Sequence, residues 1–309
     1  MLKKYTKLIL KIAVSAIFLF WVIYEVDWLS VWKNIQSIKS AYLIFYVLAV
    51  LAGMIISAYK WKVLANYKEI KLNFGGFFKY YLAGTFINNF MPSFIGGDTF
   101  KAYKTGKPQG KYIESASAVM MDRITGLFGA TILAMIFTLI NIKNVIGNTT
   151  LIIVNGFVLF SFSIDIFIMK VRRKDFWSRF KKYFPKKIVA FIVDLGTYSS
   201  DREILKKTVL LAFAFDFVGI ALANYILFVA LGIKISLINY FSIIFLISII
   251  ASVPISINNI GIKEWAYITF FGAFGLTASS VVTVAIISRF VQMFISFFAL
   301  PVYLGRNKK

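Results

Sequence analysis

The chain has 309 residues, of which 60% are hydrophobic and 18% aromatic, and its formal net charge is +22. With a mean hydropathy of +0.79, this composition is typical of polytopic membrane proteins and excludes a large soluble domain. The absence of cysteine and histidine excludes disulfides, thiolate metal sites and histidine-based acid–base catalysis. We therefore expect no metal and no cofactor, and the 13 acidic residues leave little for soluble enzymatic chemistry.

The positive charge is concentrated in short segments between apolar stretches, such as 60–71, 101–111 and 172–187. This is the positive-inside pattern, in which lysine and arginine mark the cytoplasmic loops of a membrane protein. Topology explains the charge, so we expect no nucleic-acid partner, although contact with anionic lipid headgroups should follow. The basic residues at the two ends of the chain predict that both termini lie on the cytoplasmic side of the cell membrane.

Apolar segments predict one all-α membrane domain, 1–309, with about seven to eight transmembrane helices. The first is predicted to be an uncleaved helix rather than a signal peptide, because no small-residue cleavage site follows it. The segments predicted to cross the membrane are 8–23, 41–58, 120–140, 150–169, 208–231, 235–253 and 277–304. A basic linker, 170–207, joins a first half, 1–169, to a second half, 208–309. Within it, apolar residues at helical spacing over 188–198 predict an amphipathic helix against the inner leaflet or the mouth of a cavity.

The segment 74–103 combines apolar residues with features that break a helix. Pro92 ends the preceding helix, because it lacks a backbone N–H. Gly96 and Gly97 allow unusual backbone conformations, and Asp98 is a favoured N-cap for the next helix. Both flanks are basic and the segment is too short for two crossings, so we expect a re-entrant hairpin that opens to the cytoplasm. Broken helices of this kind mark substrate sites in transporters; the alternative is an ordinary cytoplasmic turn.

A second broken stretch lies within 236–274, where its joint reads Pro254-Ile255-Ser256-Ile257-Asn258-Asn259-Ile260-Gly261-Ile262-Lys263-Glu264. The basic C-terminus indicates that this second hairpin re-enters from the outer side. Each half of the chain then holds one broken hairpin, and the two hairpins have opposite orientations. That is the arrangement which an inverted-topology repeat would produce.

Charged residues within the predicted spans are costly in a bilayer and are therefore candidate site residues. Asp122 and Arg123 form either an interfacial pair that reaches toward water or a pair that faces a cavity beneath the first hairpin. Asp216 lies further into its span and is open to a functional or a structural role. Arg289 lies deep in the last span, and its expected partner is Asp216 or Glu264.

Three motifs taken together point to a family. They are N-N-F-M-P-S-F-I-G-G-D-T-F-K-A-Y from residue 88, M-D-R-I-T-G-L from residue 121 and V-P-I-S-I-N-N-I-G-I-K-E from residue 253. The chain resembles the flippase-like transmembrane domain of lysylphosphatidylglycerol synthases and its stand-alone relatives, over residues 8–304. The resemblance implies movement of a lipid between leaflets. It does not carry the synthase activity, because we expect a stand-alone member without the soluble synthase domain. The family usually has arginine where this chain has Lys263, which keeps the charge but loses the fork that holds a phosphate bidentately.

We therefore expect a transporter that moves a phospholipid, an aminoacylated lipid or a glycolipid between leaflets, through a cavity lined by the two joints. No loop of the type G-x-x-x-x-G-K-[ST] occurs in the sequence, so transport should be passive or ion-coupled. Candidate partners are anionic or modified membrane lipids, a second copy of the chain and a lipid-modifying enzyme. The residues expected to line the cavity or to bind headgroups are Asn88, Asn89, Gly96, Gly97, Asp98, Lys101, Asp122, Arg123, Asp216, Asn258, Asn259, Gly261, Lys263, Glu264 and Arg289.

Two other functions are open to this sequence, although we expect no catalytic residues. A membrane enzyme acting on a lipid-linked substrate would use Asp98 or Glu264 as a base, but the sequence offers neither metal ligands nor a close pair of acids. A non-transporting partner of a lipid-modifying enzyme is the second alternative, and it would make the charged joints dispensable.

Overall fold

The structure is a computed structural model that describes residues 2–90, 96–171, 185–253 and 256–304. Within these residues every regular element is a helix, which confirms the predicted all-α class. The helices of the first half are α1 (Leu2–Glu25), α2 (Trp28–Ser37), α3 (Ser40–Tyr67), α4 (Phe74–Phe90), α5 (Gly96–Gly106), α6 (Tyr112–Ile140), α7 (Ile142–Ile146) and α8 (Thr149–Val171).

The second half continues with a short amphipathic helix and then a long helix that contains a π-helical turn. Its helices are α10 (Lys186–Thr197), α11 (Arg202–Phe215), the π turn (Asp216–Leu222), α12 (Ala223–Ala230), α13 (Leu237–Ser252), α14 (Ile262–Gly272), α15 (Ala278–Phe297) and α16 (Leu300–Leu304). Short 3-10 turns occupy Lys107–Gln109, Tyr198–Ser200 and Ile257–Asn259.

Helices long and apolar enough to cross a membrane recur along the described chain. Four qualify by length and composition: Ser40–Tyr67, Tyr112–Ile140, Arg202–Ala230 and Ala278–Phe297. A fifth candidate is the bent pair Ile9–Glu25 and Trp28–Ser37, whose helices are bent by 81°. Shorter apolar helices are found at Thr149–Phe160 and Leu237–Ser252. The described residues thus hold four to five candidate spans, and the number of seven to eight stays a prediction.

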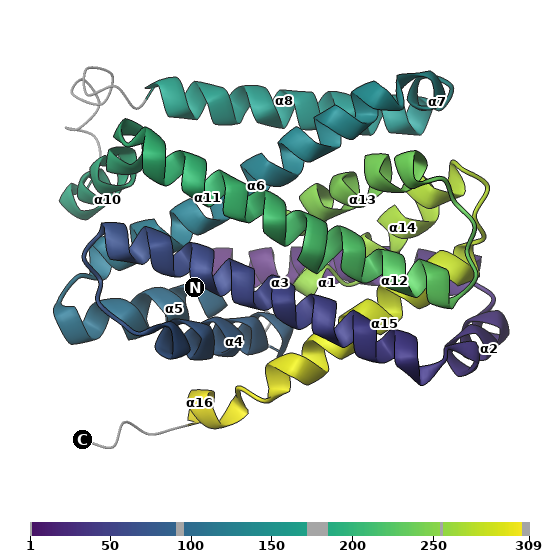
Figure 1. Cartoon of the computed structure of the whole chain (residues 1–309), viewed down its shortest axis with the longest axis horizontal. Helices are drawn as coiled ribbons and strands as arrows, with labels where there is room; N and C mark the ends of the chain where they lie inside the picture. Colours follow the sequence, from purple (N-terminus) through teal and green to yellow (C-terminus); the bar gives the residue numbers. More distant parts are fainter. Residues whose placement is uncertain (1, 91–95, 172–184, 254–255, 305–309) are drawn as a thin grey trace.

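The first broken stretch folds as α4 and α5, which pack against each other. The predicted break at Pro92 lies outside the described residues, but α4 ends before it at Phe90 and α5 begins after it at Gly96. Asp98 lies in the first turn of α5, not at an N-cap as predicted, and its carboxylate pairs with basic side chains. In Figure 1 these two helices lie at the end of the molecule that also holds α10 and α16.

The second broken stretch folds as α13 and α14, joined by the 3-10 turn Ile257–Asn259. Its open end, where α13 begins and α14 stops, lies at the opposite end of the molecule, near α2 and α7 (Figure 1). The two hairpins therefore enter the helix bundle from opposite ends. This is the relative orientation that the charge pattern predicts.

Glycines allow the long helices at the centre of the bundle to approach closely. A Cβ added to Gly53 of α3 would lie 2.4 Å from the Cα of Gly219 in the π turn. A Cβ added to Gly129 of α6 would lie 2.9 Å from the Cβ of Ala212 in α11. Side chains at the two glycines would force the helices apart, so small residues allow the close packing here.

Two connections between predicted spans, 24–40 and 141–149, contain the short helices α2 and α7. The helix α2 starts because the carboxylate of Asp27 accepts hydrogen bonds from the backbone N–H groups of Leu29 and Ser30, at 3.0 and 3.3 Å. The sequence shows this signal, because an aspartate that can cap a helix stands just before apolar residues.

The described part of the linker confirms the predicted amphipathic helix, α10. The basic run 172–184 lies outside the described residues. Leu195 at the end of α10 and Tyr198 just after it are buried beside α3 and α6. The ammonium of Lys68 holds α10 in place through the carboxylate and the backbone carbonyl of Asp194, both at 2.8 Å. The next helix, α11, begins at Arg202, before the predicted end of the linker.

Candidate functional site

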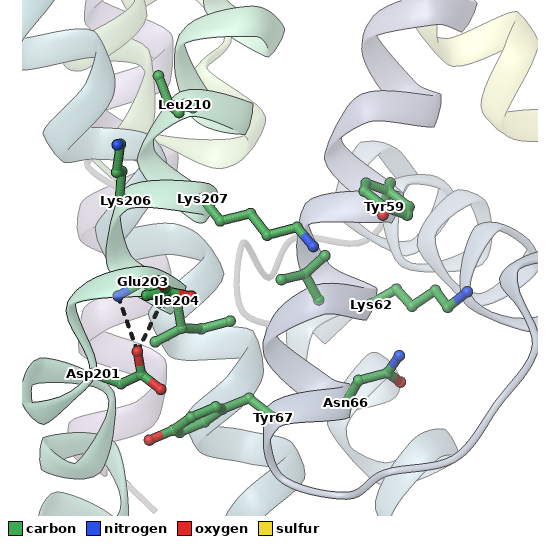
Figure 2. A pocket seen from close by; sticks show the side chains of 11 residues that line it. Tyr59, Lys62, Asn66, Tyr67, Asp201, Glu203, Ile204, Lys206, Lys207 and Leu210 are labelled. Atoms are coloured by element: carbon green, nitrogen blue, oxygen red, sulfur yellow. Dashed lines mark hydrogen bonds between the residues drawn. The ribbon is translucent and has the colours of Figure 1, made fainter.

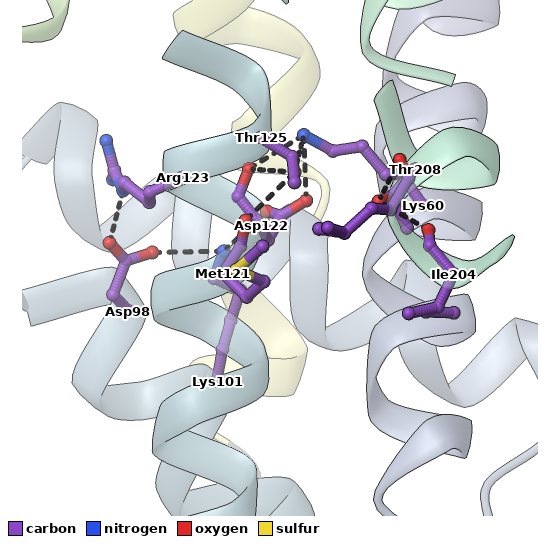
Figure 3. Close-up of polar contacts among 10 residues, drawn as sticks. Lys60, Asp98, Lys101, Met121, Asp122, Arg123, Thr125, Ile204 and Thr208 are labelled. Carbon is purple, nitrogen blue, oxygen red and sulfur yellow. Dashed lines mark hydrogen bonds and ion pairs between the residues drawn. The ribbon is translucent and has the colours of Figure 1, made fainter. Parts of the chain in front are cut away.

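Five charged side chains from three helices form one continuous row inside the bundle (Figure 3). Arg123 Nε lies 2.5 Å from Asp98 Oδ2, and Asp98 Oδ1 lies 3.0 Å from Lys101 Nζ. Lys101 Nζ is 3.9 Å from Asp122 Oδ2, and Asp122 Oδ1 is 3.2 Å from Lys60 Nζ. We call this row the charge chain. It links the first hairpin, through α5, to the long helices α3 and α6.

The charge chain is largely buried. Lys60 is 3% exposed, Lys101 6% and Asp122 7%. Lysine and aspartate are rarely buried to this extent unless they are paired, and here each finds a charge of opposite sign. The ammonium of Lys101 also lies over the rings of Trp61 and Tyr81, at 5.3 and 5.6 Å from their centroids, which adds a cation–π attraction.

Close packing of α4 on α5 fixes the position of Lys101. A Cβ added to Gly97 would lie 2.1 Å from the carbonyl oxygen of Gly84, so no larger residue fits at this crossing. The backbone N–H of Gly97 donates to Asn88 Oδ1 at 2.9 Å, and the side chain of Lys101 passes directly over Gly84. The predicted residues of this joint are thus brought together, including Gly96 at the first position of α5.

The charge chain lines a cavity of about 360 Å³, which we call the charged cavity. Asp216 lines it from the π turn, so the structure places this acid in the interior as predicted. Asp122 and Arg123 do not pair with each other in an interfacial bridge. Asp122 bonds the two lysines and Arg123 bonds Asp98, so both face the protein interior.

The second joint owes its shape to the left-handed backbone of Asn258 and Asn259, at φ 49° and 54°. Asparagine tolerates this conformation better than most residues, which explains why the joint uses an Asn pair. Gly261 follows at φ 83° and packs against α1, where an added Cβ would lie 2.7 Å from the Cβ of Phe18. The turn presents the carbonyl oxygens of Asn258 and Asn259 to Arg289, at 2.9 and 3.2 Å.

Arg289 and Glu264 form the ion pair that the sequence offered as one of two options. Arg289 Nη2 and Nε lie 2.8 and 3.0 Å from Glu264 Oε1. Glu264 Oε2 accepts from the backbone N–H of Gly261 at 2.8 Å, so the carboxylate ties the start of α14 to α15. Asp216 is not a partner of Arg289, because it lies in the charged cavity beside Lys60.

Lys263 has a different environment from the other cations of the site. Its ammonium donates to Ser288 Oγ at 2.7 Å and lies 5.8 Å from the centroid of the Tyr267 ring. Among the described residues, no carboxylate lies within 4.0 Å of it. It is half-buried, so its charge is partly withdrawn from solvent and has a neutral partner.

The two joints meet. The side-chain amide of Asn258 donates to the carbonyl oxygen of Asn89 at 3.3 Å, and the amide of Asn89 donates to Ser296 Oγ of α15 at 2.9 Å. Between the joints lies a second cavity of about 380 Å³, the joint cavity, which is lined by the polar residues Tyr81, Thr85, Asn88, Asn89, Arg123, Asn224, Ser248, Ser252, Asn258, Asn259, Lys263, Tyr267, Arg289 and Gln292.

The joint cavity and the charged cavity are neighbours that differ in the charged groups lining them. They share wall residues, including Arg123. Among the described residues, Arg123, Lys263 and Arg289 are the charged groups that line the joint cavity, and all three are cations. The charged cavity has three cations and three carboxylates. Arg123 is paired with Asp98 and Arg289 with Glu264, so Lys263 is the lining cation that has no carboxylate partner among the described residues.

Lys60 is the main residue that the sequence did not identify. Its place in a basic segment predicted a cytoplasmic position, but α3 continues to Tyr67 and carries Lys60 on its buried face. The sequence held one signal for this position. Lys60 follows Ser57 by three residues, so the two side chains share a face of the helix, and Ser57 lines the same cavity. The sequence analysis also missed Gly84, where α4 and α5 cross. Its small size was the sequence feature that could have indicated a close helix contact.

A further hollow of about 690 Å³ lies between α3 and α11, away from the joints (Figure 2). Lys62 and Lys207 line it, together with Asp201, whose carboxylate caps α11. None of the site residues predicted from the sequence lines this hollow. The joint cavity and the charged cavity together are therefore the candidate site.

Comparison with known proteins gives two matches. Residues 8–299 match the family model described as "Lysylphosphatidylglycerol synthase TM region". The UPF0104 membrane protein PH1989 of Pyrococcus horikoshii is 23% identical over 337 residues, an alignment that covers 100% of this chain and 98% of the relative. No solved structure matches the chain.

Proposed function

The chain belongs to the lysylphosphatidylglycerol synthase TM region family of multi-pass membrane proteins, and from this premise we propose that it moves a membrane lipid between leaflets. The substrate class is a phospholipid, an aminoacylated lipid or a glycolipid that carries a phosphate. The observation that supports this most directly is the joint cavity, because two broken hairpins meet there and the charged side chains that line it are cations.

The joint cavity suits a lipid phosphate by charge and by donor type. Lys263 supplies an ammonium whose partner is a neutral hydroxyl, and the amides of Asn88 and Asn258 add neutral donors at the cavity wall. Charge-assisted hydrogen bonds of this kind to phosphate are among the stronger ones in proteins. Lys263 makes a single-point contact where the family usually has a forked arginine.

Arg289 acts in this proposal as a positioning residue. Its guanidinium is engaged by Glu264 and by the carbonyls of Asn258 and Asn259. It therefore holds the second joint in its left-handed conformation and adds positive charge to the cavity wall. Lys263 and Arg123 are the cations proposed to contact the phosphate.

The paired hairpins suggest a route for the headgroup. One hairpin opens at each end of the bundle (Figure 1), and their joints meet at the joint cavity. Transporters with inverted repeats place substrate at such a meeting point and open it alternately to the two sides. A headgroup would enter past one hairpin, bind between the joints and leave past the other, while its acyl chains stay in the bilayer.

The same proposal assigns the location and the partners. The chain would lie in the cell membrane with both termini in the cytoplasm, and its partner would be the transported lipid rather than a nucleic acid. The proposal assigns no catalytic step to any residue.

The test is lipid translocation in proteoliposomes that contain fluorescent phosphatidylglycerol, with an impermeant quencher added outside. The wild-type chain should expose the protected inner-leaflet fluorophore faster than protein-free vesicles do. Lys263→Gln should slow the exposure by roughly 10- to 150-fold, because a charge-assisted hydrogen bond contributes about 1.5 to 3 kcal/mol. The matched control is Lys234→Gln, since Lys234 is exposed between α12 and α13, and it should behave as wild type.

The identity of the lipid is tested with the same vesicles. A fluorescent diacylglycerol glycoside that lacks phosphate should move more slowly than phosphatidylglycerol. Equal rates for the two lipids would show that the protein does not recognise the phosphate group. A wild-type rate equal to that of empty vesicles for anionic, aminoacylated and glycosylated phospholipids would overturn the transport function.

A further inference from the structure

Asp216 is a buried acid that the proposed transport path does not use. It is 2% exposed, at the start of the π turn that interrupts the long helix Arg202–Ala230. Its Oδ2 is buried and has no hydrogen-bond partner among the described residues. π-helical turns inside α-helices are frequent at functional sites, and a buried carboxylate oxygen without a hydrogen-bond partner is costly. Packing alone therefore gives no reason for an acid at this position.

Lys60 and Asp216 face the same side of α6. A Cβ added to Gly126 would lie 3.2 Å from Lys60 Nζ, and one added to Gly129 would lie 3.2 Å from Asp216 Oδ2. Positions three apart on a helix are neighbours on its surface. The ammonium of Lys60 is bound to Asp122, at 3.2 Å from Oδ1 and 2.7 Å from the backbone carbonyl. One lysine thus lies between two acids and is bonded to only one of them.

Resting on the transport function proposed above, we propose that Asp216 is a proton-binding site that couples proton uptake to lipid movement. With a proton on Asp216, Lys60 stays on Asp122 and the charge chain is the one described here. When the proton leaves, the carboxylate of Asp216 attracts Lys60 away from Asp122. Asp122 then attracts Lys101 away from Asp98, and Asp98 pairs with Arg123 alone.

The consequence reaches the joint cavity through Arg123, which lines both cavities. Its Nε bonds Asp98 Oδ2, while Asp98 Oδ1 is shared with Lys101. If Lys101 leaves, Asp98 holds Arg123 more strongly and withdraws its charge from the joint cavity. Protonation of Asp216 therefore favours phosphate binding, and deprotonation favours release. A two-state ion-pair network of this kind links proton and lipid occupancy reciprocally.

The surroundings of Asp216 favour a proton over a metal ion. The ammonium of Lys60 is the charged group that acts on it, and a second cation beside that ammonium would be repelled. Among the described residues, no cluster of three or more acids could hold a metal. The other titratable or polar groups that line the charged cavity are Ser57 of α3, Tyr81, Thr85 and Asn88 of α4, Asp98 and Lys101 of α5, Asp122 and Arg123 of α6, and Ser248 and Ser252 of α13.

The remaining elements packed against the π turn contribute no further charge near Asp216. The nearest charged residue of α11 is Lys207, more than two helical turns before Asp216. The helix α12 contributes Tyr225 and Asn224, and the amide of Asn224 donates to the backbone carbonyl of Ile220 at 2.8 Å. The hydroxyl of Tyr240 on α13 donates to the carbonyl of Ala221 at 2.7 Å.

The proton site is tested without transport by infrared difference spectroscopy on the purified full-length chain, titrated over the whole pH range in which it stays folded. The wild type should show a carboxylic-acid carbonyl band that titrates, and Asp216→Asn should lose it. The matched control is Asp201→Asn, because asparagine caps α11 as well as aspartate does and Asp201 lies outside both cavities. That variant should keep the band.

Coupling is then tested with the fluorescent phosphatidylglycerol vesicles at a series of equal internal and external pH values. Wild-type translocation should change with pH over the range in which the band titrates, and Asp216→Asn should translocate without that dependence. An unchanged band in Asp216→Asn would overturn the proton site. A lost band with unaltered pH dependence would overturn the coupling. A titrating band without any lipid movement would refute the transport function and leave the proton site standing.

Discussion

Arg289→Gln removes the guanidinium that holds the second joint to α15. The variant loses both contacts with Glu264 Oε1 and the two donors that reach the carbonyls of Asn258 and Asn259. Glutamine is shorter and neutral, so it replaces neither the charge nor the fork. The left-handed turn at Asn258 and Asn259 is then held by fewer contacts, while Glu264 keeps its bond to the backbone N–H of Gly261.

The magnitude follows from the burial of the pair. The side chains of Arg289 and Glu264 are 16% and 8% exposed, and breaking a buried ion pair by removing one partner costs about 3 to 5 kcal/mol. We expect the lower end, about 3 kcal/mol, because Glu264 retains one donor and Arg289 is not fully buried. Glu264→Gln combined with Arg289→Gln should recover part of this loss, since no uncompensated charge is then left in the interior.

The assay is reversible unfolding in mixed detergent micelles, followed by tryptophan fluorescence, for the wild type, both single variants and the double variant. Arg202→Gln serves as the control, because Arg202 is an exposed arginine at the start of α11, and it should change stability by less than about 0.5 kcal/mol. A loss below about 1 kcal/mol for Arg289→Gln, the size expected of an exposed pair, would refute the argument that this ion pair holds the joint.

Two further variants test how the hairpin and α10 are held. Gly97→Ala should lower thermal stability and expression in detergent, because its Cβ would lie 2.1 Å from the carbonyl oxygen of Gly84. Gly196→Ala is the control and should have little effect, because a Cβ there meets nothing within 4 Å. Equal stability of the two variants would contradict the close packing of α4 on α5. Lys68→Met should speed amide hydrogen exchange in α10, because its ammonium bonds that helix at 2.8 Å; unchanged exchange would show that apolar packing alone holds α10.

Much of the fold was predictable because its signals are local in the sequence. Apolar length gave the long helices α3, α6 and α15, and helical spacing gave α10. Charge alternation gave the opposite orientation of the hairpins, which the helix bundle reproduces (Figure 1). The short helix α2 in a connection was not predicted, although the side chain of Asp27 that caps it is a local signal.

The membership of the site was also largely visible, because a charged residue in an apolar helix must find a partner. The sequence did not show which of these charged residues pair with each other. Glu264 and Arg289 lie 25 residues apart and were one of two options, and nothing local distinguished that option from Asp216. Lys60 was assigned to a loop because a lysine at the end of an apolar run has the same sequence signal whether it faces water or an acid.

The sequence by itself determined which residues are expensive to bury and where the backbone must break. Those properties belong to single residues: a proline without an N–H, an asparagine that tolerates a left-handed turn, a charge within hydrocarbon. Only the tertiary structure decided that the two joints touch at Asn89 and Asn258, and that Lys60 completes the charge chain. These contacts join segments distant in the chain, and their distances are set by how closely glycines such as Gly53 and Gly129 let the long helices pack.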